Sequence, residues 1–314
     1  MIILSSPIEK LPFSDTVVTV GTFDGVHLGH QHIIAKVIEE SRRLQAASVL
    51  ATFEPHPKLV VSRELLPPIH LLTTLKEKAA VVQGMGIDCL LVVKFTPEFA
   101  ATPASEFVHE TLVNKLKMRS IVIGHDHAFG RNREGNEELL NRLGKERGFN
   151  VRAVQPLLSQ QEIISSTVIR KALQSGDIER ANKFLGRPYS FRGMVVKGRE
   201  QGRKIGYPTA NILPDDSAKL VPKAGIYVTT ILWRGQKFKS VTYIGARPTF
   251  DEKDRVVEVH IDKFDKEIYG EELTVFFHSY LRDDKKFDSK DELINSIRQD
   301  KINAIKFLDN GGIN

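Results

Sequence analysis

The first half of the chain alternates short, continuous apolar runs with segments whose apolar residues recur at helical spacing. Runs dominated by Val, Ile and Leu predict strands, and their continuity indicates that both faces of each strand are covered. From about Gly29, for example, Ile33, Ile34, Val37 and Ile38 fall on one face of a helix. Strand–helix alternation of this kind predicts a doubly wound parallel sheet. The expected strands are 16–20, 48–53, 89–93 and 121–123, and further helices are expected at 74–83 and 105–116.

The pattern changes after about Gly186, where short apolar runs are separated by Gly and Pro and little helical spacing remains. Residues 257–261 alternate apolar and polar positions, as a strand with one buried face does. Short strands at this spacing predict a closed antiparallel barrel or a sandwich. Helical spacing returns at 289–308, and the glycines that follow it are typical of a helix end. The expected strands are 194–196, 226–232, 238–244, 256–261 and 273–278.

The chain of 314 residues is longer than one small core usually organises, so we expect two domains, 1–185 and 186–314. A hydrophobic fraction of 41% is sufficient for two cores and excludes a disordered chain. The single cysteine, Cys89, excludes an intramolecular disulfide and a Cys-based zinc site and fits a reducing compartment. No apolar run approaches about 20 residues, and the first residues lack a signal-peptide pattern. We therefore expect a cytoplasmic protein without a membrane partner, whose oligomeric state, a homo-oligomer included, is open.

The formal net charge of +6 suits an anionic partner, but 45 basic against 39 acidic residues is a mild excess. A nucleic-acid-binding protein is the alternative from a different functional class. Such a protein should interleave aromatic with basic residues on one sheet face. Aromatic residues make up 8% of this chain and do not cluster in that way. We expect no nucleic-acid partner, and salt-sensitive binding to unrelated RNA would contradict this expectation.

The most informative stretch, Gly21-Thr22-Phe23-Asp24-Gly25-Val26-His27-Leu28-Gly29-His30, follows the first expected strand and opens the first helix. Its glycines allow a ligand to approach the backbone, and the helix N-terminus favours phosphate. His27 and His30 are three residues apart, so one helical turn places both on the same side. Two imidazoles there can stabilise charge that develops on the α-phosphate of a nucleotide. The alternative is a turn with two surface histidines, and the surrounding glycines at a strand–helix junction disfavour it. The stretch is neither a Walker loop nor a Gly-x-Gly-x-x-Gly fingerprint.

A second polar stretch, Ser165-Ser166-Thr167, precedes a helical pattern, so one of these residues can cap the helix. The remaining hydroxyl and N–H groups, with Arg170 one turn further on, could hold the β- and γ-phosphates of ATP. Taken alone, this stretch is better explained as a plain N-cap followed by a surface arginine.

Two further stretches follow expected strands. Phe53-Glu54-Pro55-His56-Pro57 is stiff, so it would hold one edge of a pocket or simply form a rigid loop. Residues 124–135 contain too little apolar surface for a core, and Arg131 and Arg133 could meet phosphate.

These stretches occur in the order found in a known family. The His27-Leu28-Gly29-His30 element resembles that of the nucleotidyltransferase superfamily, which includes class I aminoacyl-tRNA synthetases, and the whole run is similar to the bacterial FAD synthetase version. The resemblance implies a Rossmann-like α/β nucleotidyltransferase domain. The family usually has an aromatic residue directly after the aspartate, where this chain has His127. The resemblance implies His27 and His30 as catalytic residues, Gly21, Phe23, Gly29, Ser165, Ser166, Thr167 and Arg170 as nucleotide-binding, and Phe53, Pro55, His56, Asp126 and Arg131 as flavin-binding.

The second half contains a basic glycine-rich stretch from Lys197 to Asn211, which ends in Pro208-Thr209-Ala210-Asn211. Glycines and cations together suit a polyphosphate. Thr209 and Asn211 are oxygen donors two residues apart, on the same side of an extended chain, and hard oxygen ligands suit Mg²⁺. A basic loop that touches nucleic acid or solvent is equally compatible with charge and glycine content alone.

Glu258 lies on an expected strand and faces opposite to Val257 and Val259. If that face points into the mouth of a barrel, Glu258 could be the general base for a substrate hydroxyl. Without further context, an ordinary exposed strand carboxylate is the simpler interpretation.

This half resembles the riboflavin kinase module in its glycine-rich loop, its Pro-Thr-Ala-Asn turn and the later stretches 225–227, 244–250, 257–260 and 269–270. The resemblance implies a closed antiparallel barrel with a C-terminal helix. It implies Glu258 as the base and Thr209 and Asn211 as Mg²⁺ ligands. It further implies Gly198, Gly202, Arg203 and Lys204 as nucleotide-binding residues, and Arg282, in a segment with Phe287, as flavin-binding.

Together the two resemblances cover about residues 15–305 and imply a member of the bifunctional riboflavin kinase/FMN adenylyltransferase family. Such an enzyme phosphorylates riboflavin with ATP and Mg²⁺ to FMN, and then joins FMN to the AMP part of a second ATP, giving FAD and pyrophosphate. The expected partners are these small molecules. The alternative within the enzyme class is that only one module is active and the other serves as a scaffold.

Overall fold

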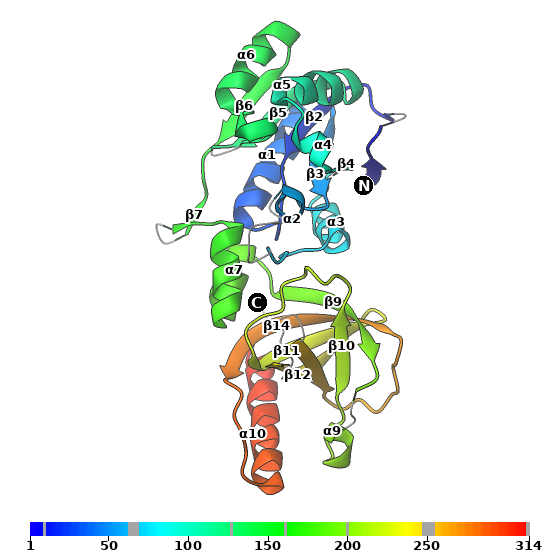
Figure 1. Ribbon diagram of the computed structural model, residues 1–314, viewed down its shortest axis with the longest axis vertical. Helices are drawn as coiled ribbons and strands as arrows, with labels where there is room; N and C mark the ends of the chain where they lie inside the picture. Colours follow the sequence, from blue (N-terminus) through cyan, green and yellow to red (C-terminus); the bar gives the residue numbers. More distant parts are fainter. Residues whose placement is uncertain are drawn as a thin grey trace. The chain divides into compact units, whose positions relative to one another are not determined.

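The computed structural model describes residues 1–8, 11–61, 69–125, 128–159, 162–198, 201–246 and 255–311. The chain forms two compact units (Figure 1). The first comprises Met1–Ile69 and Thr73–Ser165, and the second comprises His70–Leu72 and Ser166–Asn314. The structural division therefore falls earlier in the chain than residue 185, where the sequence pattern places the domain boundary, and the boundary between the two activities stays a prediction.

A six-stranded parallel sheet forms the centre of the first unit, as the alternating pattern predicted. The chain order reverses at β2, which pairs with β3 on one side and with β5 on the other. Ligands of such sheets bind outside the carboxyl ends of the strands at this switch point. The sheet order is β1 (Ile2–Ser5), β4 (Cys89–Lys94), β3 (Ala47–Glu54), β2 (Thr16–Val20), β5 (Met118–Gly124) and β6 (Asn150–Val154).

Both faces of this sheet are buried, because adjacent residues of one strand enter different cores. Val17 packs in a cluster with Ile34 and Val82, whereas Val18 packs in a cluster with Phe107 and Leu140. The first face is covered by α1 (Leu28–Leu44) and α3 (Leu75–Gly84), and the second by η1 (Phe107–Lys115) and α6 (Glu137–Arg147). The continuous apolar runs noted in the sequence follow from this two-sided burial.

The helix expected at 105–116 differs from the prediction. It begins as α5 (Ala104–Glu106) and continues as the π-helix η1, with a hydrogen bond from the Leu116 N–H to the Thr111 carbonyl. Helical spacing in the sequence does not distinguish i→i+4 from i→i+5 hydrogen bonding, so the π-helix was not foreseen.

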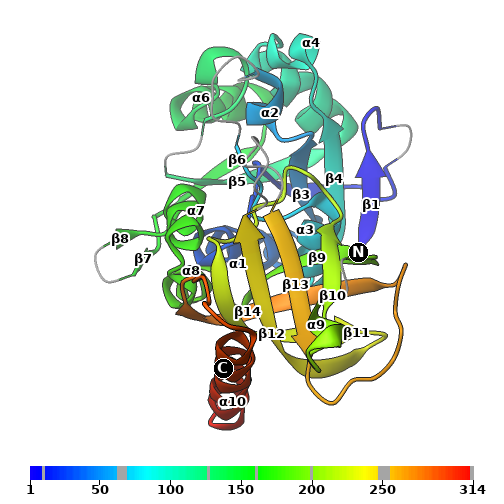
Figure 2. The same ribbon diagram turned by 60° about the horizontal axis from the view of Figure 1, so that its bottom comes forward.

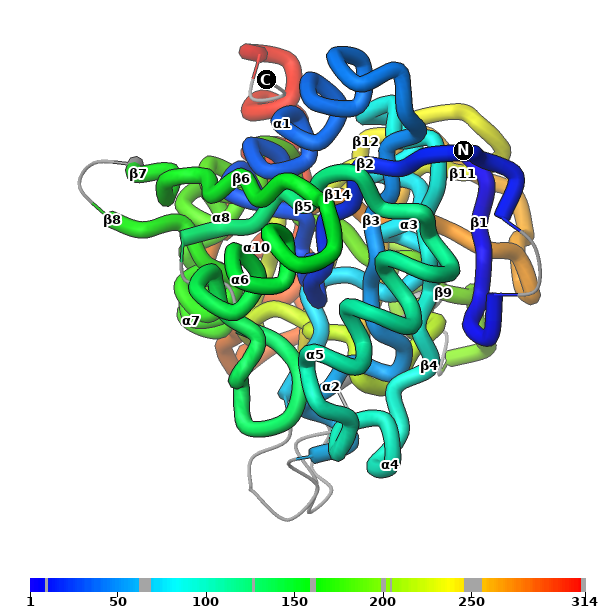
Figure 3. The backbone as a smooth tube through the Cα atoms, turned by 90° about the horizontal axis from the view of Figure 1, so that it is seen from above, coloured from blue at the N-terminus to red at the C-terminus, as the bar shows by residue number. Residues whose placement is uncertain are grey.

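The hairpin β7–β8 extends away from the parallel sheet (Figure 3). The remaining elements of this unit are α2 (Pro57–Val61), α4 (Pro97–Ala100), η2 (Arg131–Arg133), β7 (Leu158–Ser159) and β8 (Glu162–Ile163).

The second unit is a closed six-stranded antiparallel barrel, because β9 pairs with both β10 and β14 (Figure 2). Closure decides between the barrel and the sandwich that the pattern allowed. Tyr189, Phe191, Tyr227 and Phe277 fill the barrel as fully buried aromatic rings. The barrel order is β10 (Ala210–Pro214), β13 (Arg255–Ile261), β12 (Gln236–Ala246), β11 (Gly225–Trp233), β14 (Glu272–Arg282) and β9 (Tyr189–Val196).

Helices complete the second unit. α7 (Ser166–Ser175) and α8 (Ile178–Leu185) precede the barrel, and α8 packs on β9 and β14. α10 (Lys290–Asp309), the expected C-terminal helix, starts at the N-cap Ser289 and packs on β11 and β12. The short α9 (Gln201–Lys204) lies in the glycine-rich stretch. Across the described ranges, no helix is long and apolar enough to cross a membrane.

Candidate active sites

The turn between β2 and α1 has an unusual backbone. Phe23 and Val26 adopt positive φ angles of 47° and 38°, and Gly25 between them has φ 84°. Positive φ is uncommon for a bulky or β-branched residue and costs about 1–3 kcal/mol per residue, so it persists only where the surroundings fix it. The turn lies directly after β2, at the switch point of the sheet.

The structure brings His27 and His30 together at the start of α1. His27 is the N-cap, and its Nδ1 accepts a hydrogen bond from the His30 N–H at 3.3 Å. The two imidazole rings stack with centroids 3.6 Å apart, and the Phe23 ring meets His30 edge-on at 5.1 Å. In neutral His27 the proton therefore lies on Nε2, which makes this atom a hydrogen-bond donor. The chemical role of the pair stays a prediction.

Gly29 lies close to His27 and to the stretch before the Ser-Ser-Thr motif. A Cβ at Gly29 would meet the His27 ring at 3.2 Å and the Ile164 carbonyl oxygen at 3.5 Å. Ser165 directly follows Ile164, so the structure brings this predicted residue near the helix that carries the histidines. At Gly21 a Cβ would meet the Phe23 ring at 3.1 Å, so this glycine leaves room for the aromatic side chain.

The remaining residues of that motif belong to the second unit. α7 begins at Ser166, and Thr167 is exposed in its first turn. Arg170 Nε donates to the His70 carbonyl oxygen at 2.8 Å. Their contribution to nucleotide binding stays a prediction.

Polar contacts hold the turn from the side of α3, and the motifs in the sequence did not reveal them. Asp24, which is 2% exposed, accepts a hydrogen bond from the Thr73 N–H at 3.0 Å. The Thr73 hydroxyl accepts one from the Gly25 N–H at 2.9 Å. α3 itself begins with a capping box between Thr74 and Glu77. The Thr-x-x-Glu spacing was a readable signal for this helix start, but not for its contacts with the turn.

The predicted flavin-binding residues of the first unit lie on and after β3. Phe53 packs in the core against the rings of Phe95, Phe99 and Phe107, with centroid separations of 5.6, 6.0 and 6.4 Å. Pro55 follows a cis peptide bond. His56 is buried, and its Nδ1 accepts from the Lys58 N–H at 3.2 Å.

The loop after β5 carries Arg131, whose side chain is exposed in η2. The N–H of Arg131 donates to the Thr102 carbonyl oxygen at 3.2 Å. Asp126 and His127 lie outside the described residues. The contact of this loop with flavin stays a prediction.

In the second unit, the structure brings Thr209, Asn211 and Glu258 together at the junction of β10 and β13. Thr209 Oγ1 donates to Glu258 Oε2 at 3.1 Å, and Asn211 lies opposite Glu258 in the strand register. The glycine-rich loop closes on the same point. A Cβ at Gly198 would overlap the Asn211 amide, and one at Gly202 would overlap the Tyr207 carbonyl oxygen.

Two predicted cationic residues lie beyond these glycines. The Arg203 side chain is exposed, whereas the side chain of Lys204 lies outside the part of the chain that the structure describes.

Tyr243, which the sequence motifs did not single out, lies beside Glu258. The two residues are directly opposite on β12 and β13. The Tyr243 hydroxyl donates to Asp284 Oδ2 at 2.8 Å. Burial, and then the neighbouring Asp284 carboxylate, raise the pKa of Tyr243, so the phenol stays protonated and acts as a donor.

His260 fixes the Pro-Thr-Ala-Asn turn from β13. Its Nδ1–H donates to the Pro208 carbonyl oxygen at 2.9 Å, and its ring meets Tyr207 edge-on at 5.6 Å. Burial lowers the pKa of His260, which favours the neutral ring with its proton on Nδ1. His260 therefore connects the strand of the proposed base with the turn of the proposed metal ligands.

Arg282, expected to bind flavin, is engaged within the protein. Its Nε and Nη2 donate to the two carboxylate oxygens of Asp300 at 3.0 and 2.7 Å, and Nη2 also donates to Ser296 at 3.0 Å. The guanidinium lies 5.9 Å from the Phe287 ring centroid. These bonds tie the end of β14 to α10.

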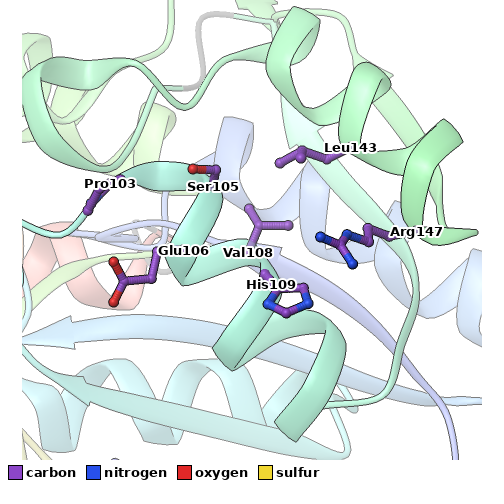
Figure 4. A pocket seen from close by; sticks show the side chains of 7 residues that line it. All are labelled: Pro103, Ser105, Glu106, Val108, His109, Leu143 and Arg147. Carbon is purple, nitrogen blue, oxygen red and sulfur yellow. The ribbon is translucent and has the colours of Figure 1, made fainter.

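A surface hollow of about 320 Å³ in the first unit contains none of the expected site residues (Figure 4). It lies between the α5–η1 segment and α6, with Glu106, His109 and Arg147 on its wall. The His109 Nδ1 lies 2.9 Å from the Glu110 carboxylate. Because the hollow holds opposite charges on exposed side chains, we assign no ligand to it.

Comparisons with known proteins identify the family of each half of the chain. The FAD synthetase family model matches residues 10–168, and the riboflavin kinase family model matches residues 185–308. A solved structure from Streptococcus pneumoniae, named a macrolide-efflux protein, is 32% identical and superposes with a TM-score of 0.84 over 96% of this chain and 98% of that chain.

Curated relatives match over nearly the whole chain. The bifunctional riboflavin kinase/FMN adenylyltransferases of Bacillus subtilis (strain 168) and Escherichia coli (strain K12) are 36% and 34% identical, and cover 94% and 96% of this chain and 93% and 95% of their own. That of Listeria monocytogenes is 37% identical and covers 98% of each chain. The chain therefore belongs to the family of bifunctional riboflavin kinase/FMN adenylyltransferases, the transferases of FMN and FAD biosynthesis.

Proposed function

We propose that the chain phosphorylates riboflavin to FMN at the Thr209–Asn211–Glu258 site and adenylylates FMN to FAD at the His27–His30 site. The observation that supports this division is that the two family models match separate segments, 10–168 and 185–308. Each pair or triad of proposed catalytic residues lies within one of these segments.

In the kinase reaction, Glu258 accepts the proton of the ribityl 5′-hydroxyl while that oxygen attacks the γ-phosphorus of ATP, and the bond to ADP breaks. The Thr209 hydroxyl orients the carboxylate through its 3.1 Å bond to Oε2. The hydroxyl retains lone pairs that can face a cation, and the Asn211 carbonyl adds a second hard oxygen.

Thr209 and Asn211 would hold Mg²⁺, which supplies charge neutralisation on the transferred phosphoryl group. The glycines 198 and 202 allow the loop to come close to this point, and Arg203 and Lys204 provide positive charge for the polyphosphate.

In the adenylyltransferase reaction, the FMN phosphate attacks the α-phosphorus of ATP, and the bond to pyrophosphate breaks. His27 and His30 stabilise the charge on the α-phosphate, and no covalent enzyme intermediate is required. Gly21, Phe23 and Gly29 form the turn that receives the nucleotide, with Ser165, Ser166, Thr167 and Arg170 for its β- and γ-phosphates. Phe53, Pro55, His56, Asp126 and Arg131 make the flavin side, and Arg282 supports the flavin side of the kinase.

We further propose a cytoplasmic enzyme whose partners are its small-molecule substrates. The buried single thiol of Cys89 suits a reducing compartment. Burial raises the pKa of this thiol to about 11, which keeps it protonated and unreactive at neutral pH.

Incubation of the purified protein with riboflavin, ATP and Mg²⁺, followed by separation of the flavins, tests the proposal. FMN should appear first and FAD second, and omission of Mg²⁺ should abolish FMN formation. If FMN accumulates and supplied FMN is never converted, only the kinase module is active. Separate supply of riboflavin and FMN therefore distinguishes the bifunctional enzyme from a single active module.

A further inference from the structure

Lys78 is a buried cation in the middle of the first unit. Its side chain lies on α3 and is 4% exposed, whereas Lys76 on the same helix is exposed. Removing an ammonium group from water costs free energy unless hydrogen bonds and opposite charges compensate. The contacts of Lys78 therefore show which groups compensate the burial of its ammonium group.

The ammonium group joins the ends of two adjacent strands. Nζ donates to the Thr22 carbonyl oxygen at 2.7 Å and to Thr52 Oγ1 at 2.9 Å. Thr52 in turn donates its hydroxyl to the same Thr22 carbonyl at 3.1 Å. Thr22 follows β2 and opens the strained turn, and Thr52 lies near the carboxyl end of β3. The three groups form a closed triangle beneath the turn.

Two carboxylates act on the charge of Lys78. Burial lowers the pKa of Lys78, and the negative charges of Asp24 and Glu54 oppose this shift. Asp24 is part of the same turn and is held by the Thr73 N–H. Lys78 is thus connected to the turn by a hydrogen bond at Thr22 and by charge at Asp24.

The turn needs support of this kind because its backbone is strained at Phe23 and Val26. α3 provides it at two places. Thr73 binds Asp24 and Gly25 at the start of the helix, and Lys78 binds Thr22 one turn further along. The strained residues 23 and 26 lie between this support and the histidines, so displacement of Thr22 would displace the backbone that leads to His27.

We propose that Lys78 is a positioning residue of the adenylylation site, which fixes the Thr22 carbonyl and so preorganises residues 22–27 for the triphosphate of ATP. The proposal rests on the proposed function of this turn. It assigns Lys78 no contact with substrate. Because the turn of residues 22–27 is proposed to receive the nucleotide, the loss of Lys78 should affect ATP rather than FMN.

The test uses the full chain with the substitutions Lys78→Met, which keeps the length of the side chain without its charge, and Lys78→Arg, which keeps the charge. The exposed Lys76→Met on the same helix is the matched control. FAD formation from supplied FMN is measured while ATP is varied, and the kinase rate of each preparation reports on the second unit.

Lys78→Met should raise the KM for ATP and lower kcat/KM for ATP about 10²-fold, the scale of losing a preorganised contact. The KM for FMN and the kinase rate should stay within about twofold, Lys76→Met should match the unmodified protein, and Lys78→Arg should recover at least part of the loss. An unchanged KM for ATP in Lys78→Met, with or without a fall in kcat, would overturn the proposal, because a folding defect alone reduces the amount of active enzyme.

Thr52→Val decides the matter if Lys78→Met does not fold, because valine keeps the shape of threonine and removes only the hydroxyl that Lys78 and Thr22 share. A raised KM for ATP supports the proposal, and an unchanged one overturns it. If the unmodified protein itself forms no FAD, the proposed function fails instead, so the two failures are distinguishable.

Discussion

The hydroxyl of Thr209 donates a hydrogen bond to the carboxylate of Glu258 across 3.1 Å, although the two residues are 49 positions apart in the chain. Strand pairing makes this contact possible, since β10 and β13 place Asn211 directly opposite Glu258. The proposed base and the proposed metal ligands therefore occupy one corner of the barrel. This relationship determines what substitutions there should do.

Glu258→Gln should lower the rate of FMN formation by about 10² to 10⁴, the usual contribution of a general base. Glutamine retains the shape and can still accept the Thr209 hydrogen bond, so riboflavin binding should change little. FAD formation from supplied FMN serves as the control and should survive. A near-normal rate of FMN formation would return Glu258 to the role of a structural strand residue.

Gly198→Ala should weaken the binding of ATP with Mg²⁺, because the added methyl group would overlap the Asn211 amide. Overpacking typically costs about 1–3 kcal/mol, so we expect an increase in the KM for ATP of about tenfold. Asn211→Ala should have a similar effect, and higher Mg²⁺ should partly restore activity in both variants. Gly84→Ala is the control, since a Cβ there meets no atom within 4 Å. Mg²⁺ titration of the kinase rate measures the effect, and an unchanged Mg²⁺ dependence would argue against Asn211 as a ligand.

His27→Ala or His30→Ala should reduce FAD formation by about 10²-fold or more, the scale of losing a charge-stabilising donor. FMN formation, which we propose takes place in the second unit, should stay close to that of the unmodified protein. Separate assays with riboflavin and with FMN check this. An equal loss of both activities would indicate a folding defect rather than a chemical role.

A fragment of residues 186–314 should be less stable than one of residues 166–314, although the sequence pattern changes only near Gly186. α8 buries Phe184 and Leu185, and Asn182 donates to the Phe277 carbonyl at 2.8 Å and accepts from the Tyr189 N–H at 2.6 Å. Loss of two large buried side chains and these bonds should cost about 3 kcal/mol or more. Thermal unfolding of the two fragments measures the difference. Because both fragments lack His70–Leu72, the absence of this segment cannot cause a difference between them. Equal Tm values would therefore show that α7 and α8 do not stabilise the barrel.

Acid should destabilise the barrel through His278. This residue is 7% exposed, and its Nε2 is hydrogen-bonded to the Thr230 hydroxyl at 2.9 Å. Burial, together with the charge of Lys237, lowers its pKa to about 4. Because the pKa is lower in the folded than in the unfolded state, the unfolded chain binds more protons between about pH 6.5 and 4. The contribution of neutral His278 to the free energy of unfolding is therefore complete above about pH 6.5. It is lost as the pH falls toward 4, by up to about 3 kcal/mol.

Denaturant unfolding of the second-unit fragment at pH 7 and pH 4.5 tests this expectation. His278→Gln should be less stable than the unmodified fragment at pH 7 but should lose less stability between the two values. If the free energy of unfolding depends on pH equally in the unmodified fragment and in His278→Gln, groups other than His278 cause the acid sensitivity.

The sequence by itself determined the class of each unit. Strands β2, β3 and β4 were located within two residues of their observed bounds, because strands buried on both faces leave continuous apolar runs that can be read locally. The glycine motifs were equally readable in the sequence, because glycine allows close approach and positive φ angles at single positions. The edge strand β1 and the short β10 were not foreseen, since an exposed edge and a Pro-containing strand leave little periodic signal.

Only the tertiary structure decided which polar groups meet. Lys78 reaches Thr22 across 56 positions, Asp24 reaches Thr73 across 49, and Arg282 is bound by Asp300 on α10. None of these pairs has a fixed spacing that a sequence pattern could reveal, because their distances are set by how strands and helices pack. The same packing assigns α7 and α8 to the barrel unit, against the change of pattern near Gly186. Local sequence patterns thus determined which elements form, because each pattern depends on neighbouring residues only, whereas long-range packing determined which side chains meet between those elements.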